Sequence, residues 1–206
     1  MKKKKKINIT TLTKKKNFLF DQLKNLYQKM DNAYSDLAQK IGLSCEGCEN
    51  NCCVSYFQHH THIEWAYLFK GFNKLPKQKK EEVLIRAREY VKQTRQAISL
   101  GVPPKIMCPL NEEGKCILYD HRLMICRLHG VPNIIKMPNG AVHRFPGCFR
   151  AVELTKELPI DLFVMDRTPF YIELAMLEKK YKKLLKKTLP KVDHTLAEML
   201  ILGEPR

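Results

Sequence analysis

The stretch Cys45-Glu46-Gly47-Cys48-Glu49-Asn50-Asn51-Cys52-Cys53 holds four of the eight cysteines of this 206-residue chain. A turn across Cys45 and Cys48 brings two sulfurs together, and Gly47 can take the positive φ that such a turn often needs. Cys52 follows one helical turn after Cys48, which keeps a third sulfur within reach. The spacing therefore indicates a site that chelates a metal.

The other four cysteines follow later in the chain, at Cys108, Cys116, Cys126 and Cys148. Residues 108–119 predict a small hairpin around an acidic, glycine-containing turn, which places Cys108 near Cys116. A brief helix then directs Cys126 back toward the hairpin, with Arg122 and Arg127 close by. Cations near thiolates lower the pKa of the thiols and offset the negative charge of the site. We therefore take all eight cysteines as metal ligands.

The composition favours ligation over the other roles that cysteines play. With 44% hydrophobic residues the chain can bury a core as one domain. It has no apolar run near the ~20 residues of a membrane-spanning helix, and its N-terminus lacks the features of a secretory signal. We therefore expect a cytoplasmic protein, in a compartment where disulfides are rare. Disulfides and buried apolar thiols remain the alternatives, but clustered spacing favours a metal.

The formal net charge of +16 is concentrated outside the cysteine region. One basic block comprises Lys2–Lys6 and Lys14–Lys16, and a second comprises Lys179, Lys180, Lys182, Lys183, Lys186 and Lys187. We interpret them as a solvated arm and the solvent-exposed face of a helix, because no set of aromatic residues suited to stacking on bases accompanies the charge. Contact with nucleic acid or with an acidic protein through the basic arm is the alternative.

Apolar residues at steps of three and four predict an amphipathic helix over 17–41. Further helices are predicted over 63–70, after Pro76, from Thr168, and over 195–202. Thr61 and Glu64 form the pattern of a capping box, which places three nearby histidines (His59, His60 and His62) at an exposed helix entry. Asn139-Gly140 between two apolar runs predicts a hairpin over 134–145.

These elements predict a fold that is mainly α with small β-hairpins, as a single metal-stabilised helical domain. Residues 1–16 are predicted to be a disordered basic arm, because they combine dense positive charge with little apolar content. Residues 17–150 form the predicted cysteine-cluster metal-binding domain. Residues 151–206 are predicted to be a C-terminal helical extension that packs on it.

The cysteine pattern resembles that of the prokaryotic CxxCxxxCC (YkgJ-like) cysteine-cluster proteins, described as zinc- or iron-chelating domains. The resemblance rests on Cys45-x2-Cys48-x3-Cys52-Cys53 followed by Gly114-x-Cys116-x2-Tyr119-x2-Arg122-x3-Cys126-Arg127, and it covers roughly residues 42–150. Leu123 stands where that family usually has proline. The cysteine cluster is more distantly similar to that of the flagellin lysine methylases, which implies an iron–sulfur cluster used with S-adenosylmethionine. Shared residues of this kind do not transfer an activity.

Eight thiolates suffice for two four-sulfur sites, either structural zinc or iron–sulfur clusters. We favour an iron–sulfur cluster, because adjacent Cys52 and Cys53 would strain a single tetrahedral zinc site. The division of the eight cysteines between sites stays open. S-adenosylmethionine is a further candidate cofactor that no motif supports.

Three functional hypotheses follow. The chain binds a metal or cluster that supports redox chemistry or group transfer, it is a structural zinc module in a protein- or nucleic-acid-binding adaptor, or it is a metal carrier or assembly factor. The first hypothesis predicts a pocket beside the cysteines, lined by Tyr119, Arg122, Arg127 or His129. Catalysis itself stays open, since no phosphate loop, nucleophile elbow or metalloprotease motif is present.

Overall fold

The computed structural model describes residues 9–46, 48, 52–159, 162–186 and 188–205. Its first element, α1 (Ile9–Lys40), begins eight residues earlier than predicted. The prediction of a disordered arm is therefore wrong for residues 9–16, and residues 1–8 lie outside the described part. Lysine is a good helix former, and Lys16 is held by Glu204 at 2.8 Å and by the Phe20 ring at 5.5 Å. These contacts extend the helix into the lysine-rich segment.

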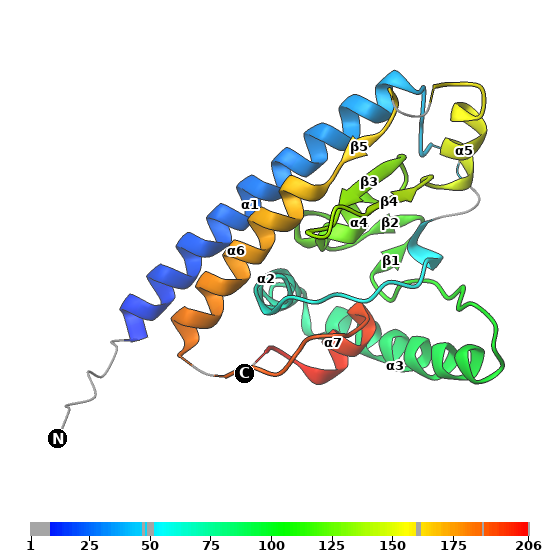
Figure 1. Cartoon of the computed structure of the whole chain (residues 1–206). Coiled ribbons are helices and arrows are strands. Elements are labelled where there is room, and N and C mark those ends of the chain that lie inside the picture. Colours follow the sequence, from blue (N-terminus) through cyan, green and yellow to red (C-terminus); the bar gives the residue numbers. More distant parts are fainter. Residues whose placement is uncertain (1–8, 47, 49–51, 160–161, 187, 206) are drawn as a thin grey trace.

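Helix α1 packs lengthwise against α6 (Thr168–Leu185), and the two helices run antiparallel (Figure 1). The apolar sides of α1 and α6 that face each other enclose the first hydrophobic core. Its largest fully buried side chains are Leu23, Leu26, Tyr27, Met30, Ile63, Leu128 and Tyr181. The apolar spacing predicted for residues 17–41 is confirmed, because the residues that recur at three and four face this core.

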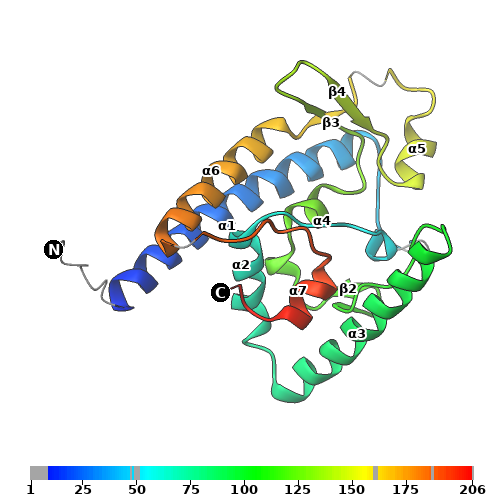
Figure 2. The same ribbon diagram turned by 60° about the horizontal axis from the view of Figure 1, so that its bottom comes forward.

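A second hydrophobic core lies between α2 (His62–Phe72), α3 (Lys77–Ser99) and α7 (Leu196–Leu202) (Figures 1 and 2). It contains Trp65, Leu68 and Phe69 of α2. Helix α2 also sends Ile63 and Ala66 into the first core. A helix that is apolar on nearly all sides must be buried on all sides, and α2 therefore joins the two cores.

The entry of α2 differs from the prediction. Thr61 is the N-cap residue, but its side chain accepts no capping hydrogen bond. Its hydroxyl donates instead to Glu64 Oε2 at 2.7 Å, and Glu64 Oε1 accepts from Tyr27 Oη and from the backbone N–H of Met124. The buried carboxylate of Glu64 thus links α1, α2 and α4 (Met124–Leu128), a role that takes precedence over helix capping.

The histidines before α2 were expected to be exposed, and for two of them this is wrong. His59 and His62 are buried, because the chain pairs with the C-terminal segment here: the backbone N–H of His59 donates to the carbonyl of His194 at 2.8 Å. His62 Nδ1 lies 2.9 Å from Glu178 of α6. Only His60 among the three is exposed, beside Asp193.

Both predicted hairpins are present. Strands β1 (Asn111–Glu112) and β2 (Lys115–Cys116) pair antiparallel, and so do β3 (Asn133–Lys136) and β4 (Val142–Phe145). A third strand, β5 (Met165–Asp166), pairs parallel with β3, giving the strand order β4-β3-β5. The model is thus mainly helical with two small sheets, as predicted.

Three further elements complete the described chain. They are the 3₁₀ turns η1 (Cys52–Val54) and η2 (Tyr119–His121) and the short helix α5 (Phe149–Thr155). At the start of α7, Thr195 and Glu198 form a true capping box. Residues after 150 supply Leu174 and Leu177 to the first core and Met199 and Leu200 to the second. No helix in the described part is both long and apolar enough to cross a bilayer.

Candidate metal-binding site

Five separate segments carry the eight cysteines to one region between the two cores. Cys45 and Cys48 follow α1, Cys52 and Cys53 lie in η1, Cys108 and Cys116 belong to the first hairpin, Cys126 lies in α4, and Cys148 is the N-cap residue of α5. Cys108 and Cys116 pack against the second core, whereas Cys148 packs against the first. The cysteines therefore lie where the two cores meet.

One group, the inner set, comprises Cys53, Cys108, Cys116 and Cys126, all half-buried. The backbone N–H of Cys108 donates to the carbonyl of Cys53 at 3.0 Å, and the hairpin register sets Cys116 opposite Asn111. Burial, together with the neighbouring Cys116 and Cys53 thiols, raises the pKa of Cys126 to about 12. Burial also raises the pKa of Cys108 and Cys116. The predicted approach of Cys126 to the hairpin is thus present, since these thiols act on one another electrostatically.

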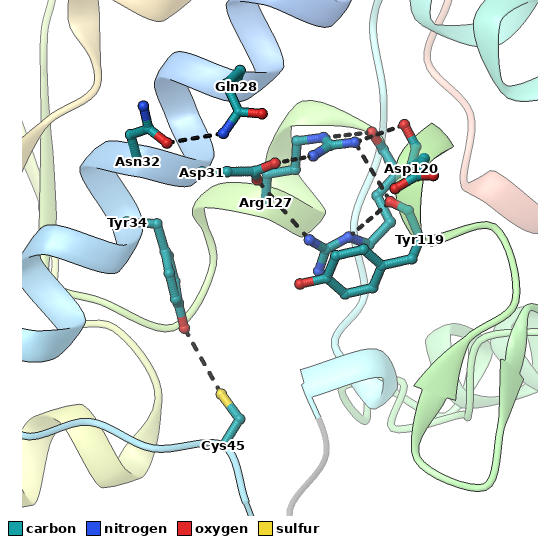
Figure 3. A network of polar contacts seen from close by, with 9 residues as sticks. Gln28, Asp31, Asn32, Tyr34, Cys45, Tyr119, Asp120 and Arg127 are labelled. Atoms are coloured by element: carbon teal, nitrogen blue, oxygen red, sulfur yellow. Dashed lines mark hydrogen bonds and ion pairs between the residues drawn. The ribbon is translucent and has the colours of Figure 1, made fainter.

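The other group, the outer set, comprises Cys45, Cys48, Cys52 and Cys148, and three of these cysteines, all except Cys48, act on Tyr34 of α1. Tyr34 Oη lies 3.9 Å from Cys45 Sγ (Figure 3). Burial raises the pKa of the Tyr34 hydroxyl, and Cys45, Cys52 and Cys148 raise it further. Cys48 joins through its backbone N–H, which donates to the carbonyl of Cys45 at 3.3 Å. Cys45 and Cys52 are exposed, so this set faces solvent.

Adjacent Cys52 and Cys53 connect the two sets. Their thiols hydrogen-bond to each other, which raises the pKa of Cys52 and lowers the pKa of Cys53. Burial opposes the second shift, whereas the Asn111 side chain and the Arg122 guanidinium favour it. The opposite directions of the two shifts thus have one main cause, the hydrogen bond between the two thiols.

Arg122 and Arg127 lie beside the inner set, as predicted, and α1 holds them there. Asp31 of α1 forms an ion pair with Arg127, whose Nη2 also donates to the carbonyl of Asp120 at 2.9 Å (Figure 3). Arg122 lies 4.0 Å from Asp31 and stacks over Tyr119, with its Cζ 3.6 Å from the ring centroid. Arg122 lowers the pKa of Cys53, Cys116 and Cys126 against the effect of burial. These cations favour thiolates in the inner set.

Sequence reasoning missed Arg150, which fixes the outer set. Its Nη1 donates to the carbonyls of Ser44 and Glu46, each at 2.9 Å, on both sides of Cys45. Arg150 lies in α5, a helix that was not predicted, two residues after Cys148. The one signal in the sequence was the position of Arg150, two residues after Cys148. Arg122 and Arg127 were expected to lie near thiols for the same reason, because a cation offsets the negative charge of thiolates.

The histidines do not join either set. His62 binds Glu178, and His121 stacks on Tyr67 with ring centroids 4.8 Å apart. His129 Nε2 lies 3.4 Å from Ser55 Oγ, and burial lowers the pKa of this histidine. Within the described ranges, no three cysteine, histidine or carboxylate side chains already stand in the arrangement of a metal-ion site.

Two hollows are described, and neither contains a cysteine. One, of about 440 Å³, lies between α1 and α6, and a smaller one lies between α3 and α7. The pocket expected from Tyr119, Arg122, Arg127 and His129 is neither of these. Tyr119 is exposed and covers Arg122.

Comparisons with known proteins found no matching family, no similar curated protein and no similar solved structure. The likeness to CxxCxxxCC proteins therefore stays a resemblance of motifs.

Proposed function

We propose that this chain binds metal through its cysteine thiolates, in two four-cysteine sites where the two hydrophobic cores meet. The observation that supports it is the gathering of eight thiols from five chain segments, with Arg122 and Arg127 beside the inner set. Soft thiolates are the ligands that zinc and iron–sulfur clusters take. The donor chemistry therefore fits, and ion binding would turn the thiols of each set toward a common centre.

An iron–sulfur cluster is the favoured occupant, with zinc as the alternative. The thiols of each set come from three or more segments, and a cluster spreads its ligands over a wider volume than a single zinc ion does. The exposure of Cys45 and Cys52 makes the outer set the one open to reaction. A bound cluster would supply electron transfer or support group transfer there.

The two sets have different roles in this proposal. The inner set is half-buried, and two of its members, Cys108 and Cys116, pack on the second core, so its metal would stabilise the fold, because site formation is coupled to folding. The outer set is open to solvent, so its metal can exchange or react. A structural zinc module is the second candidate function, and the location of both described hollows away from the cysteines favours it.

Serine variants of the two sets test this proposal. Cys126→Ser should lower both the metal content and the midpoint of thermal unfolding, by about 5 °C or more, since a site coupled to folding is lost. Cys45→Ser should lower the metal content with a smaller thermal change. Chelator-treated wild-type protein is the reference for complete metal loss. Unchanged metal content and thermal midpoint in both variants would refute metal ligation.

A further inference from the structure

The described lysines of the two blocks, Lys14–Lys16 on α1 and those from Lys179 onward at the end of α6, are far apart in the sequence but lie at the same end of the helix pair. Because α1 and α6 are antiparallel, the start of α1 lies beside the end of α6 (Figure 1). Contacts along the pair fix this register: Lys29 meets Glu173 at 2.8 Å, and Phe20 stacks on Tyr181 at 6.5 Å. Exposed lysines at this end include Lys14, Lys15, Lys179, Lys180 and Lys183.

A hollow of about 440 Å³ with both polar and apolar lining lies between the same two helices. Gln22, Asn25 and Lys29 line it from α1, and Glu173, Met176 and Lys180 line it from α6. Lys29 neutralises Glu173, the only carboxylate in this lining. The hollow therefore has a net positive charge, since Lys180 has no carboxylate partner in the lining.

Phe18 adds an aromatic surface that the sequence did not associate with the lysines. Its side chain is 63% exposed, although Leu19 and Phe20 beside it are buried. Phe18 precedes Gln22 by four residues and follows Lys15 by three, so all three lie on one flank of α1. On α6, Lys183 follows Lys180 by three residues and continues the same line. The exposed ring of Phe18 therefore shares a flank of α1 with a lysine and with a residue that lines the hollow.

Polar atoms at this groove are left without partners. Gln22 Oε1 is buried and accepts no hydrogen bond in the described structure. Among the described residues, Lys15, Lys180 and Lys183 make no ion pair with a carboxylate.

We propose that this groove binds a single-stranded nucleic acid. Lysines on both helices would hold successive phosphates, Phe18 would stack against a base, and the amides of Gln22 and Asn25 would contact base or sugar groups. A lone exposed ring requires an unstacked base, which a single strand offers and a duplex does not. Amides and an ion pair interrupt the apolar residues of the groove, so it lacks the continuous apolar face that a membrane-surface helix presents. This function is separate from metal binding.

Fluorescence anisotropy with labelled 15-nucleotide oligo(U) and oligo(dT) tests the proposal on the full chain as purified. Lys180→Glu/Lys183→Glu should weaken binding about tenfold and make the salt dependence shallower by about 1.4, since each phosphate contact contributes about 0.7 for a single strand. Phe18→Ala should weaken binding about fivefold or more through lost stacking. All these side chains are exposed, so unchanged thermal midpoints will show that the variants fold.

The matched control is Lys92→Glu/Lys105→Glu, which makes the same charge change at two exposed lysines away from the groove. It should bind within about twofold of wild type. Binding of oligo(U), oligo(dT) or both that follows this pattern supports the proposal. It is overturned if neither oligonucleotide binds, if the control weakens binding as much as the groove variants, or if Phe18→Ala has no effect. Tighter binding to a 15-base-pair duplex or to phosphatidylserine vesicles would also overturn it.

Discussion

His59 is a titratable side chain that the fold buries as a neutral group. Burial, with a smaller contribution from His60, lowers its pKa to about 3 from an ordinary value near 6.5. Between these two values the unfolded chain binds a proton at this position and the folded chain does not. The free energy of unfolding therefore falls as the pH falls through this interval, by up to about 1.4 kcal/mol per pH unit.

Replacing His59 should remove this part of the pH dependence. His59→Gln should reduce the slope of unfolding free energy against pH between about pH 6 and pH 4. The reduction should correspond to a difference of up to one bound proton between the unfolded and folded chains. Urea unfolding at several pH values measures this slope. His60→Gln, at the exposed neighbouring histidine, should keep the wild-type slope. Equal slopes for wild type and His59→Gln would contradict the assignment.

Single residues also mark the limits of the sequence argument. The pattern Thr61-x2-Glu64 predicted a capping box and exposed histidines, whereas Glu64 is used to join three helices in the interior. The same pattern at Thr195 and Glu198 does form a capping box. The two patterns differ in their tertiary surroundings, because Tyr27 and Met124, which hydrogen-bond to Glu64, are far from it in the sequence and meet it only in the folded chain.

At the scale of elements, a close approach between two turns holds the Cys148 segment in place. Gly147 has φ +87°, and a Cβ there would lie 2.5 Å from the carbonyl oxygen of Gly130. That same oxygen accepts the backbone N–H of Cys148 at 2.9 Å. The turn before α5 thus requires glycine for both its conformation and its contact.

Gly147→Ala should therefore lower the free energy of unfolding by about 3 kcal/mol and reduce the metal content of the outer set, because the strained backbone and the clash both displace Cys148. Gly140→Ala is the matched control. Gly140 has a similar φ of +84° at the second hairpin, but nothing lies within 4 Å of its added Cβ. It should cost only about 1–2 kcal/mol from backbone strain. Denaturant unfolding compares them, and equal losses would refute the proposed clash.

The elements with a strong local signal were predictable, and those fixed by distant contacts were not. The period of α1 and the Asn139-Gly140 turn were read correctly, since both depend on neighbouring residues. Strand β5 has two residues and exists through its parallel pairing with β3. Helix α5 follows directly on the close turns at Gly147. Neither β5 nor α5 is long enough to show the periodic pattern of apolar residues that predicts a strand or a helix.

At the scale of the whole molecule, two hydrophobic cores share only a few elements. Helix α2 contributes to both, and α4 places Met124 and Leu128 in the first core next to Leu123 in the second. The cysteines come from segments on both sides of this junction. Metal ligation would thus tie the two cores together, beyond holding one loop in place.

The sequence predicted the eight candidate ligands, but the two sets depend on the tertiary structure. Spacing alone could pair Cys45 with Cys48 and Cys108 with Cys116. The approach of Cys148 to Tyr34 depends on how α1 and α5 meet. The described lysines of the two basic blocks likewise come to one end of the molecule only through the antiparallel packing of α1 and α6.

The measurement that tests metal ligation most directly is elemental analysis after anaerobic purification, together with the visible absorption spectrum. The account predicts iron and acid-labile sulfide in matching amounts, with the broad absorption of a thiolate-ligated cluster. Stoichiometric zinc in a colourless protein would keep the cysteine ligation and replace the cluster with structural sites. A folded chain that holds no iron or zinc, and whose thermal midpoint a chelator does not change, would contradict the account.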